Sequence, residues 1–230
     1  MSSPSLDLRG SSGPYLLLDA SGLTARVGVW RAGRWLAFRE SETGALDAIY
    51  AGVSSVLAEA HIPLEKLAGY LYVEGPGSVL GLRLTAMAIR TWQTNDAAKT
   101  QGMARPVWAG GSLHLAAQLM LAGGTPPPFA VFTDARQGHW NLLTIPTTDA
   151  AALITKPLQE VGENDLPQGT LYYVPARKTG ARAPAHALRM TTLLRDHPKV
   201  LKTPGLFRLV ETATPYGLAP EYKKWAGAEK

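Results

Sequence analysis

The sequence predicts an α/β protein with two similar lobes, because one strand–turn–strand pattern occurs twice. In each copy an apolar strand ends at an aspartate, a turn containing glycine follows, and a second strand returns. The aspartate is Asp19 in the copy at 15–35 and Asp134 in the copy at 129–145. Helical periodicity appears between the two copies. A duplicated unit is the simplest explanation for two hairpins of the same form.

Length and composition fit two small lobes with a buried core. The chain has 230 residues, of which 46% are hydrophobic and 18% are charged. We expect a disordered leader at 1–13, a first lobe at 14–107 and a second, smaller lobe at 108–230, with a C-terminal tail able to pack back on the first lobe. No apolar stretch is long enough to span a membrane. The absence of cysteine excludes disulfides and thiolate ligands and fits a cytoplasmic protein.

The positive charge is concentrated in one segment. The net charge is +5, and between 177 and 208 eight Lys and Arg residues stand against one acid, Asp196. A basic block beside a nearly neutral body suggests an anionic partner, with nucleic acid the obvious candidate. A solvated basic surface without a partner is the alternative.

A glycine-rich loop follows a predicted strand at 67–74 and reads GPGSVLGLR at 75–83. A P-loop needs four residues between its glycines and then Lys-Ser/Thr, whereas three residues separate Gly77 from Gly81. The dinucleotide fingerprint is one residue shorter than this loop. Both common phosphate motifs therefore fail on spacing. Glycine permits the turn and Ser78 can cap the following helix, whose N-terminus could still hold an anion.

Asp19 and Asp134 have two possible roles. An acid at the end of a strand beside a glycine turn can position a metal–phosphate complex. It can equally accept backbone N–H bonds and fix the hairpin, and we favour that structural role. The candidate anion or phosphate loops contain Asp19, Ser21, Gly75, Gly77, Ser78, Gly81, Arg83, Asp134 and Arg136.

The predicted helix at 45–60 has two distinct faces. Large apolar residues recur at helical spacing and are expected to pack on the sheet. The neighbouring face carries only small residues, which would let a partner helix approach closely. We expect that small face to be free and to form a homodimer when the chain is isolated. The candidate partner-binding residues on this helix and the next are Ala45, Ala48, Ile49, Gly52, Ser55, Leu82 and Met87.

Four segments together resemble the TsaB (YeaZ) family of bacterial tRNA threonylcarbamoyladenosine biosynthesis proteins. The family's GPGSFTGLR motif is similar to the glycine loop, and its DAR segment is similar to the stretch at Asp134. The matching segments are LLLDASGLTARVGVW, GPGSVLGLRLTAMAIR, PVWAGGSLHLAA and FTDARQGHWNLL. The resemblance implies a two-lobed fold of the actin-like ATPase and sugar-kinase superfamily (ribonuclease H-like), in which each lobe is a mixed sheet with flanking helices.

The resemblance also implies a non-catalytic scaffold subunit. Such a subunit pairs with a TsaD-like catalytic subunit through its first two helices, here 45–60 and 79–95, and works with a TsaE-like ATPase. The complex places threonylcarbamoyl on adenosine 37 of tRNA. ATP is used by the complex, so we expect no cofactor and no catalytic residue in this chain. The candidate tRNA contacts are Arg177, Lys178, Arg182 and Arg189.

Two alternative functions follow from the same fold class. A small-molecule kinase or phosphotransferase would use Asp19 and Asp134 around Mg-ATP, but no Gly-Gly adenosine loop follows the second hairpin. A metal glycopeptidase would need a His-x-x-x-His pair, and no two of the five histidines are three to five positions apart, so we expect no metal. The family's Thr after the first Asp is Ala20 here, which weakens nucleotide binding.

Overall fold

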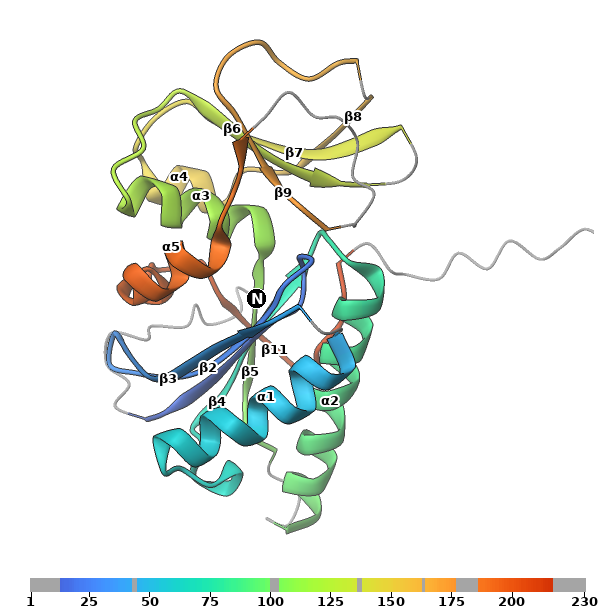
Figure 1. The fold of residues 1–230 in the computed structure, drawn as a ribbon, viewed down its shortest axis with the longest axis vertical. Coiled ribbons are helices and arrows are strands. Elements are labelled where there is room, and N and C mark those ends of the chain that lie inside the picture. Colours follow the sequence, from blue (N-terminus) through green and yellow to red (C-terminus); the bar gives the residue numbers. More distant parts are fainter. Residues whose placement is uncertain are drawn as a thin grey trace, which may run out of the picture.

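Two α/β lobes, each built on one mixed sheet, make up the fold (Figure 1). The computed structural model describes residues 13–42, 45–99, 104–135, 138–162, 164–176 and 186–216. The expected leader lies almost wholly outside them. This architecture confirms the predicted fold class of two lobes with mixed sheets and flanking helices.

The sheet of the first lobe has the strand order β11-β5-β4-β1-β2-β3. Its strands are β1 (Tyr15–Asp19), β2 (Ala25–Arg31), β3 (Arg34–Ser41), β4 (Gly69–Gly75), β5 (Val107–Gly111) and β11 (Arg208–Val210). β1 pairs antiparallel with β2 and parallel with β4. All five residues of β1 are buried, which is what a continuous apolar run in the centre of a covered sheet predicts.

The sheet of the second lobe has the order β10-β9-β6-β7-β8. Its strands are β6 (Phe129–Asp134), β7 (His139–Ile145), β8 (Gln159–Gly162), β9 (Leu171–Val174) and β10 (His186–Ala187). β6 pairs antiparallel with β7 and parallel with β9. Like β1 in the first sheet, β6 therefore lies between one antiparallel and one parallel neighbour. The two hairpins seen in the sequence occupy equivalent places in the two lobes.

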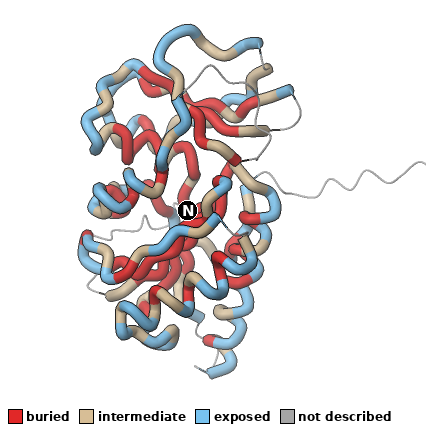
Figure 2. Tube along the Cα trace, viewed as in Figure 1, coloured by how far each residue is buried: buried red, intermediate tan, exposed pale blue. Residues whose placement is uncertain are grey.

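Helices cover the outer face of the first sheet and fill the space between the two sheets. The helices are α1 (Ala45–Ala60), α2 (Val79–Lys99), α3 (Ser112–Ala122), α4 (Ala150–Ile154) and α5 (Met190–Asp196), with 3₁₀ turns η1 (Leu64–Lys66) and η2 (Pro198–Lys202). α1 and α2 pack on the outer face of the first sheet. α3, α5 and η2 fill the space between the two sheets, in one core shared by both lobes (Figures 1 and 2).

The end of the described chain returns to the first lobe. β11 pairs antiparallel with β5, with Leu209 opposite Trp108, and forms one edge of the sheet. Beyond β11, Ala213 is fully buried in the core under α1 and α2. The backbone N–H of Tyr216 donates to the carbonyl of Glu74 at 2.8 Å. The first lobe is therefore built from both ends of the chain.

Candidate functional site at the junction of the lobes

Asp19 ends β1 at the junction between the lobes, and its carboxylate is fully occupied. One oxygen accepts bonds from the backbone N–H and the hydroxyl of Ser21, at 3.0 and 2.6 Å. The other oxygen forms an ion pair with the Arg26 guanidinium. Asp19 is only 1% exposed. Because both of these partners belong to the hairpin itself, Asp19 fixes the β1–β2 turn and balances a buried arginine.

The glycine loop packs against the same turn. The N–H of Ser78 donates to the Ser21 carbonyl at 2.7 Å. A side chain on Gly77 would collide with that carbonyl, and one on Gly81 would collide with the carbonyl of Ala20. The glycines are therefore needed for close approach between two backbone segments. This geometry accounts for the glycines without a bound phosphate, because the Ser21 and Ala20 carbonyls lie where side chains at 77 and 81 would be.

The N-terminus of α2 shows how its first N–H groups are used. The Leu82 N–H donates to the Ser78 carbonyl at 2.9 Å, and the Gly81 N–H faces the Ser78 hydroxyl at 3.4 Å. Gly75, with φ of +110°, makes the sharp exit from β4 that a residue with a side chain rarely adopts. Arg83 is exposed on α2.

Asp134 in the second hairpin is bonded in a comparable way. Its Oδ2 accepts from the Tyr173 hydroxyl at 2.6 Å and from the Ala176 N–H at 3.2 Å. Asp134 therefore ties β6 to the segment that follows β9. Arg136, the other candidate residue of this hairpin, lies outside the described residues.

The first hairpin is bonded directly to the second lobe. The N–H of Leu23 donates to the carbonyl of Pro175 at 3.0 Å. A side chain on Gly22 would come within 3.2 Å of the same carbonyl. Pro175 precedes Ala176, which is bonded to Asp134, so the two hairpins are joined through two hydrogen bonds and the Pro175–Ala176 peptide bond. The centre of the junction is closed by protein, with a cavity on each side of it.

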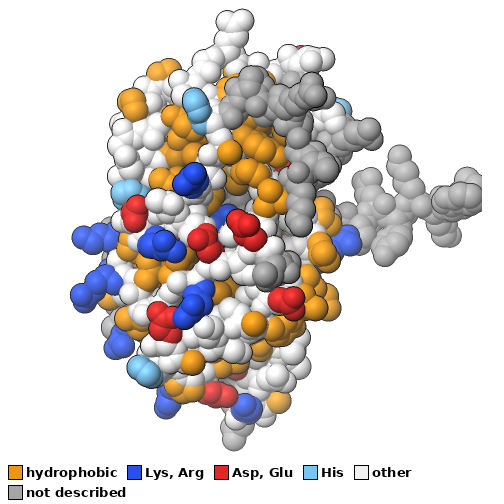
Figure 3. Space-filling view, in the orientation of Figure 1, with side chains coloured by type: hydrophobic (Ala, Val, Ile, Leu, Met, Phe, Trp, Pro, Cys, Tyr) orange, Lys and Arg blue, Asp and Glu red, His pale blue; other side chains and the backbone are white. Residues whose placement is uncertain are grey.

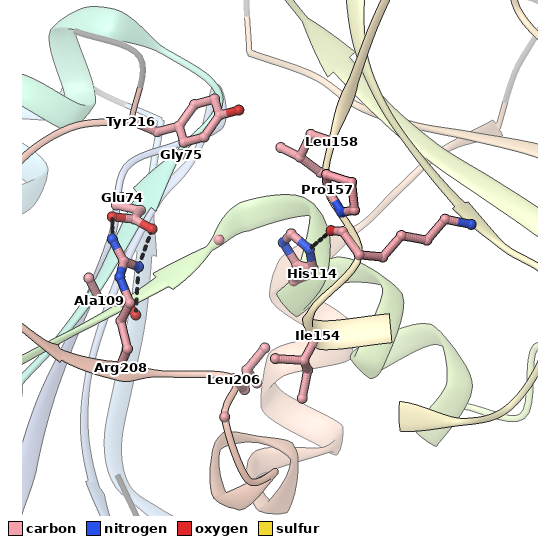
Figure 4. A pocket seen from close by; sticks show the side chains of 13 residues that line it. Glu74, Gly75, Ala109, His114, Ile154, Pro157, Leu158, Leu206, Arg208 and Tyr216 are labelled. Atoms are coloured by element: carbon pink, nitrogen blue, oxygen red, sulfur yellow. Dashed lines mark hydrogen bonds and ion pairs between the residues drawn. The ribbon is translucent and has the colours of Figure 1, made fainter. Parts of the chain in front are cut away.

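The cavity on the β4 and β5 side has a volume of about 330 Å³ (Figure 4). On one wall the Arg208 guanidinium pairs with both carboxylate oxygens of Glu74, the longer contact being 2.8 Å. Bonding to Glu74 raises the pKa of Arg208 despite its partial burial. On the facing wall His114 Nε2 lies 2.9 Å from the Lys156 carbonyl. A carbonyl only accepts, so the Nε2–H of His114 donates in this contact.

This cavity is lined by both charged and apolar side chains, but the opposite charges of Arg208 and Glu74 neutralise each other. Apolar side chains complete its walls; they are Ile154, Pro157, Leu158 and Leu206. The Lys156 ammonium is bonded to the carbonyl and hydroxyl of Thr144, at 2.8 and 2.7 Å. Such a lining can hold a small, largely neutral molecule and supplies no arranged nucleophile.

The cavity on the β2 and β3 side has a volume of about 700 Å³ and is more polar. Arg26 lines it from the first lobe and Arg189 from the second, with Glu40 and Glu42 nearby. Arg189 is the one candidate tRNA contact within the described residues, and it is exposed there. Arg177, Lys178 and Arg182 lie outside the described residues.

The small face of α1 faces the protein's own sheet, so the expectation that it is free is wrong. Ala48 is only 5% exposed, and a Cβ on Gly52 would lie 2.8 Å from the Val27 side chain of β2. Ile49 and Leu82 are buried as well. The small residues let α1 approach the sheet closely.

The exposed side of α1 and α2 carries large apolar residues instead. Met87, a candidate partner-binding residue, is 60% exposed. The others are Leu46 at 53%, Tyr50 at 47%, Val79 at 46% and Leu80 at 66%. We name Leu46, Tyr50, Leu80 and Met87 the apolar stripe. Sequence reasoning missed Leu46, Tyr50 and Leu80, although their i, i+4 and i, i+7 spacings were visible.

The described residues contain neither a cluster of metal-ligating side chains nor a long apolar helix. No group of three or more His, Asp or Glu side chains in that part of the chain is placed to hold a metal ion. No helix there has the length and apolar character needed to cross a membrane.

The fold defines the chain as a two-lobed α/β protein with one mixed sheet in each lobe. Among solved structures it is similar to YeaZ from Pseudomonas aeruginosa, with a TM-score of 0.58 and 19% identity over 88% of this chain and 98% of that one. An uncharacterized P. aeruginosa protein with similarity to peptidase YeaZ gives a TM-score of 0.53 and 20% identity over 79% and 88%. These likenesses establish the fold and confirm the resemblance at that level. No protein-family model and no curated protein sequence gives a significant match.

Proposed function

We propose that this chain is a TsaB-like scaffold subunit that pairs with a TsaD-like catalytic subunit in the complex making threonylcarbamoyladenosine on tRNA. The fold shared with the YeaZ structures supports this proposal. The order of the four sequence segments that resemble the family supports it independently. In this proposal the complex, with its TsaE-like ATPase, uses ATP, and this chain contributes an interaction surface.

The apolar stripe is the observation that carries the proposal. Leu46 and Tyr50 are one turn apart on α1, and Leu80 and Met87 are two turns apart on α2, so each pair shares one side of its helix. The two helices pack against the same face of the sheet and contact each other. Figure 3 shows hydrophobic side chains gathered at the edge where α1 meets α2. Exposed apolar side chains grouped in this way mark protein–protein contacts.

Polar residues border the stripe as in a protein interface. Arg83 and Arg90 are exposed on the same helix as Leu80 and Met87. The Arg90 Nε donates to the Ala213 carbonyl at 2.8 Å, so its side chain is held in place at the rim. An apolar centre with an arginine-containing rim fits association with a partner helix pair. When the partner is absent, the same surface can pair with a second copy of the chain.

The structure of the first hairpin gives the kinase alternative no support. Asp19 would have to release Arg26 and Ser21 to reach a magnesium–nucleotide complex. Breaking a buried ion pair leaves an uncompensated charge and costs about 3–5 kcal/mol. A scaffold role requires no such rearrangement.

Co-purification with the TsaD-like subunit of the source organism tests the proposal. The wild-type chain should co-elute with it on gel filtration, and the Leu80→Glu/Met87→Glu variant should not. Asn95→Glu/Ala98→Glu is the matched control, because it adds the same charge to exposed positions near the other end of α2. Thermal melting of each variant alone checks that the fold is kept. Failure of the wild-type chain to pair, or pairing that survives in the stripe variant, would contradict the proposal.

A further inference from the structure

Five cationic residues from both lobes gather on one surface, which we name the basic ridge. Arg31 and Arg34 flank the β2–β3 turn, and Arg195, Lys199 and Lys202 belong to α5 and η2. All are exposed except Lys202, which is partly exposed. Figure 3 shows Lys and Arg side chains along the left edge, where the β2–β3 turn meets η2.

Direct contacts hold the two halves of the ridge together. A Cβ on Gly33, at the tip of the turn, would lie 3.4 Å from the Lys199 side chain and 3.9 Å from the Lys202 ammonium. The Trp30 indole N–H donates to the Pro198 carbonyl at 2.9 Å. The Trp30–Pro198 bond joins a hairpin of the first lobe to a 3₁₀ turn 168 residues later in the chain. The two segments that carry the charges are therefore held next to each other.

Two of the cations, Arg195 and Lys202, lie against aromatic rings. The Arg195 guanidinium lies 5.8 Å from the Phe38 ring, and the Lys202 ammonium lies 6.0 Å from the Trp30 ring. The Trp35 indole N–H donates to the Leu194 carbonyl at 2.9 Å and ties β3 to α5 beside Arg195. A cation resting on a ring keeps its outer side available to an anion. Ordering these side chains in advance lowers the entropy lost on binding.

The local charge is strongly positive. Segments 31–34 and 195–202 together contain five Lys and Arg residues and one acid, Asp196. The cations lie on an exposed outer surface and not in one of the described cavities, apart from Arg195, which also borders the larger one. A spread of exposed cations fits a long polyanion with repeated charges better than a single small anion.

We propose that the basic ridge binds the phosphate backbone of RNA. The choice of RNA rests on the proposed function in tRNA modification; the ridge itself rests on the contacts above. Lys and Arg facing phosphates read charge and not bases, so the contact is independent of sequence. The ridge extends the basic block of the second lobe to two residues of the first lobe, Arg31 and Arg34, which no charge run in the sequence indicated.

Fluorescence anisotropy with a labelled tRNA transcript tests the ridge. The variants are Lys199→Glu/Lys202→Glu and, at the exposed turn, Arg34→Glu. Lys66→Glu/Lys99→Glu is the matched control, because it makes the same change of charge in η1 and at the end of α2, at the foot of the first lobe (Figure 1). Thermal melting precedes the binding assay, and Arg34→Glu alone decides the matter if the double variant fails to fold.

The double variant should lose tenfold or more in affinity. Removing two phosphate contacts should also reduce the slope of log affinity against log salt by about 1.4–1.8. The control should bind like the wild-type chain. Equal losses in ridge and control variants would overturn the proposal, because net charge alone would then explain binding. Unchanged binding in the ridge variants would overturn it as well.

Pairing with the TsaD-like subunit is measured on the same proteins, so that the two proposals fail separately. A chain that pairs but whose ridge variants bind tRNA normally contradicts only the ridge. A chain that binds tRNA through the ridge but never pairs contradicts only the scaffold function. An acidic protein captured in place of tRNA, with no measurable tRNA affinity, would also count against an RNA-binding ridge.

Discussion

The carbonyl oxygen of Ser21 occupies the space that a side chain on Gly77 would need, and it accepts a hydrogen bond of 2.7 Å from the neighbouring Ser78. The glycine loop is thus one half of a contact between two turns of the first lobe. Its glycines are explained by the backbone that lies against them, without a bound phosphate.

Gly81→Ala distinguishes packing from helix propensity. Alanine is favoured over glycine inside a helix by about 1 kcal/mol, so propensity alone predicts a more stable protein. A Cβ at position 81 would collide with the Ala20 carbonyl, so we expect a loss of about 1–3 kcal/mol in the free energy of unfolding. Urea denaturation measures it, with the exposed Asn95→Ala on the same helix as control. A stabilised Gly81→Ala variant would contradict the packing explanation.

Asp19→Asn should destabilise the protein by about 3–5 kcal/mol, because the buried Arg26 would lose its counter-charge. Glu59→Gln is the control. It breaks the Arg39–Glu59 pair, whose side chains are 53% and 47% exposed, and a surface pair contributes only about 0–1 kcal/mol. Thermal or chemical denaturation compares the two. Similar small effects at both sites would show that Asp19 does not have this structural role.

Gly52→Leu should destabilise the protein by about 2 kcal/mol or more, because the added side chain meets Val27 of β2. Ser54→Leu, on an exposed position of the same helix, should change the free energy of unfolding by no more than about 0.5 kcal/mol. Equal stability of the two variants would mean that α1 does not pack on β2 as described.

Tyr72 should make the protein sensitive to alkaline pH. Burial, aided by the charge of Glu74, raises the pKa of Tyr72 above its usual 10.0. The folded state therefore holds the proton more tightly than the unfolded state, so stability is unaffected below pH 10 and falls as the pH rises above it. The added slope is up to about 1.4 kcal/mol per pH unit.

Urea denaturation between pH 8 and pH 11 measures this slope, and Tyr72→Phe should reduce it. The variant loses the 3.3 Å bond from the Tyr72 hydroxyl to the Leu82 carbonyl, which costs about 1 kcal/mol at pH 8. Parallel pH profiles in wild type and variant would assign the alkaline sensitivity to other groups.

The sequence predicted the hairpins at Asp19 and Asp134 because local alternation and turn residues determine a hairpin. It predicted two faces for α1. Ile49 and Val53 of the large apolar face are buried as expected, but Ala48 of the small face is buried as well, and Leu46 is exposed. Periodicity separates small from large residues, whereas the distance between helix and sheet decides which side is buried. Gly52 allows α1 to lie against Val27, and this leaves Leu46 exposed at the start of the helix.

Contacts between distant segments could not be predicted in the same way. Nothing near Trp30 indicates that its indole bonds to Pro198, and nothing near Glu74 indicates a pair with Arg208. Both contacts depend on how the second lobe and the C-terminal segment pack against the first lobe. The basic ridge and the cavity beside Glu74 result from this packing between distant segments, so only the structure could locate them.

The return of β11 to the edge of β5 has a consequence for synthesis on the ribosome. The first lobe's sheet lacks its last strand until residues Arg208–Val210 have emerged, long after β5 itself at Val107–Gly111. During that interval the edge of β5 is open, and an open strand edge pairs readily with other chains. Nascent chains truncated before β11 should therefore be more dependent on chaperones than the finished protein.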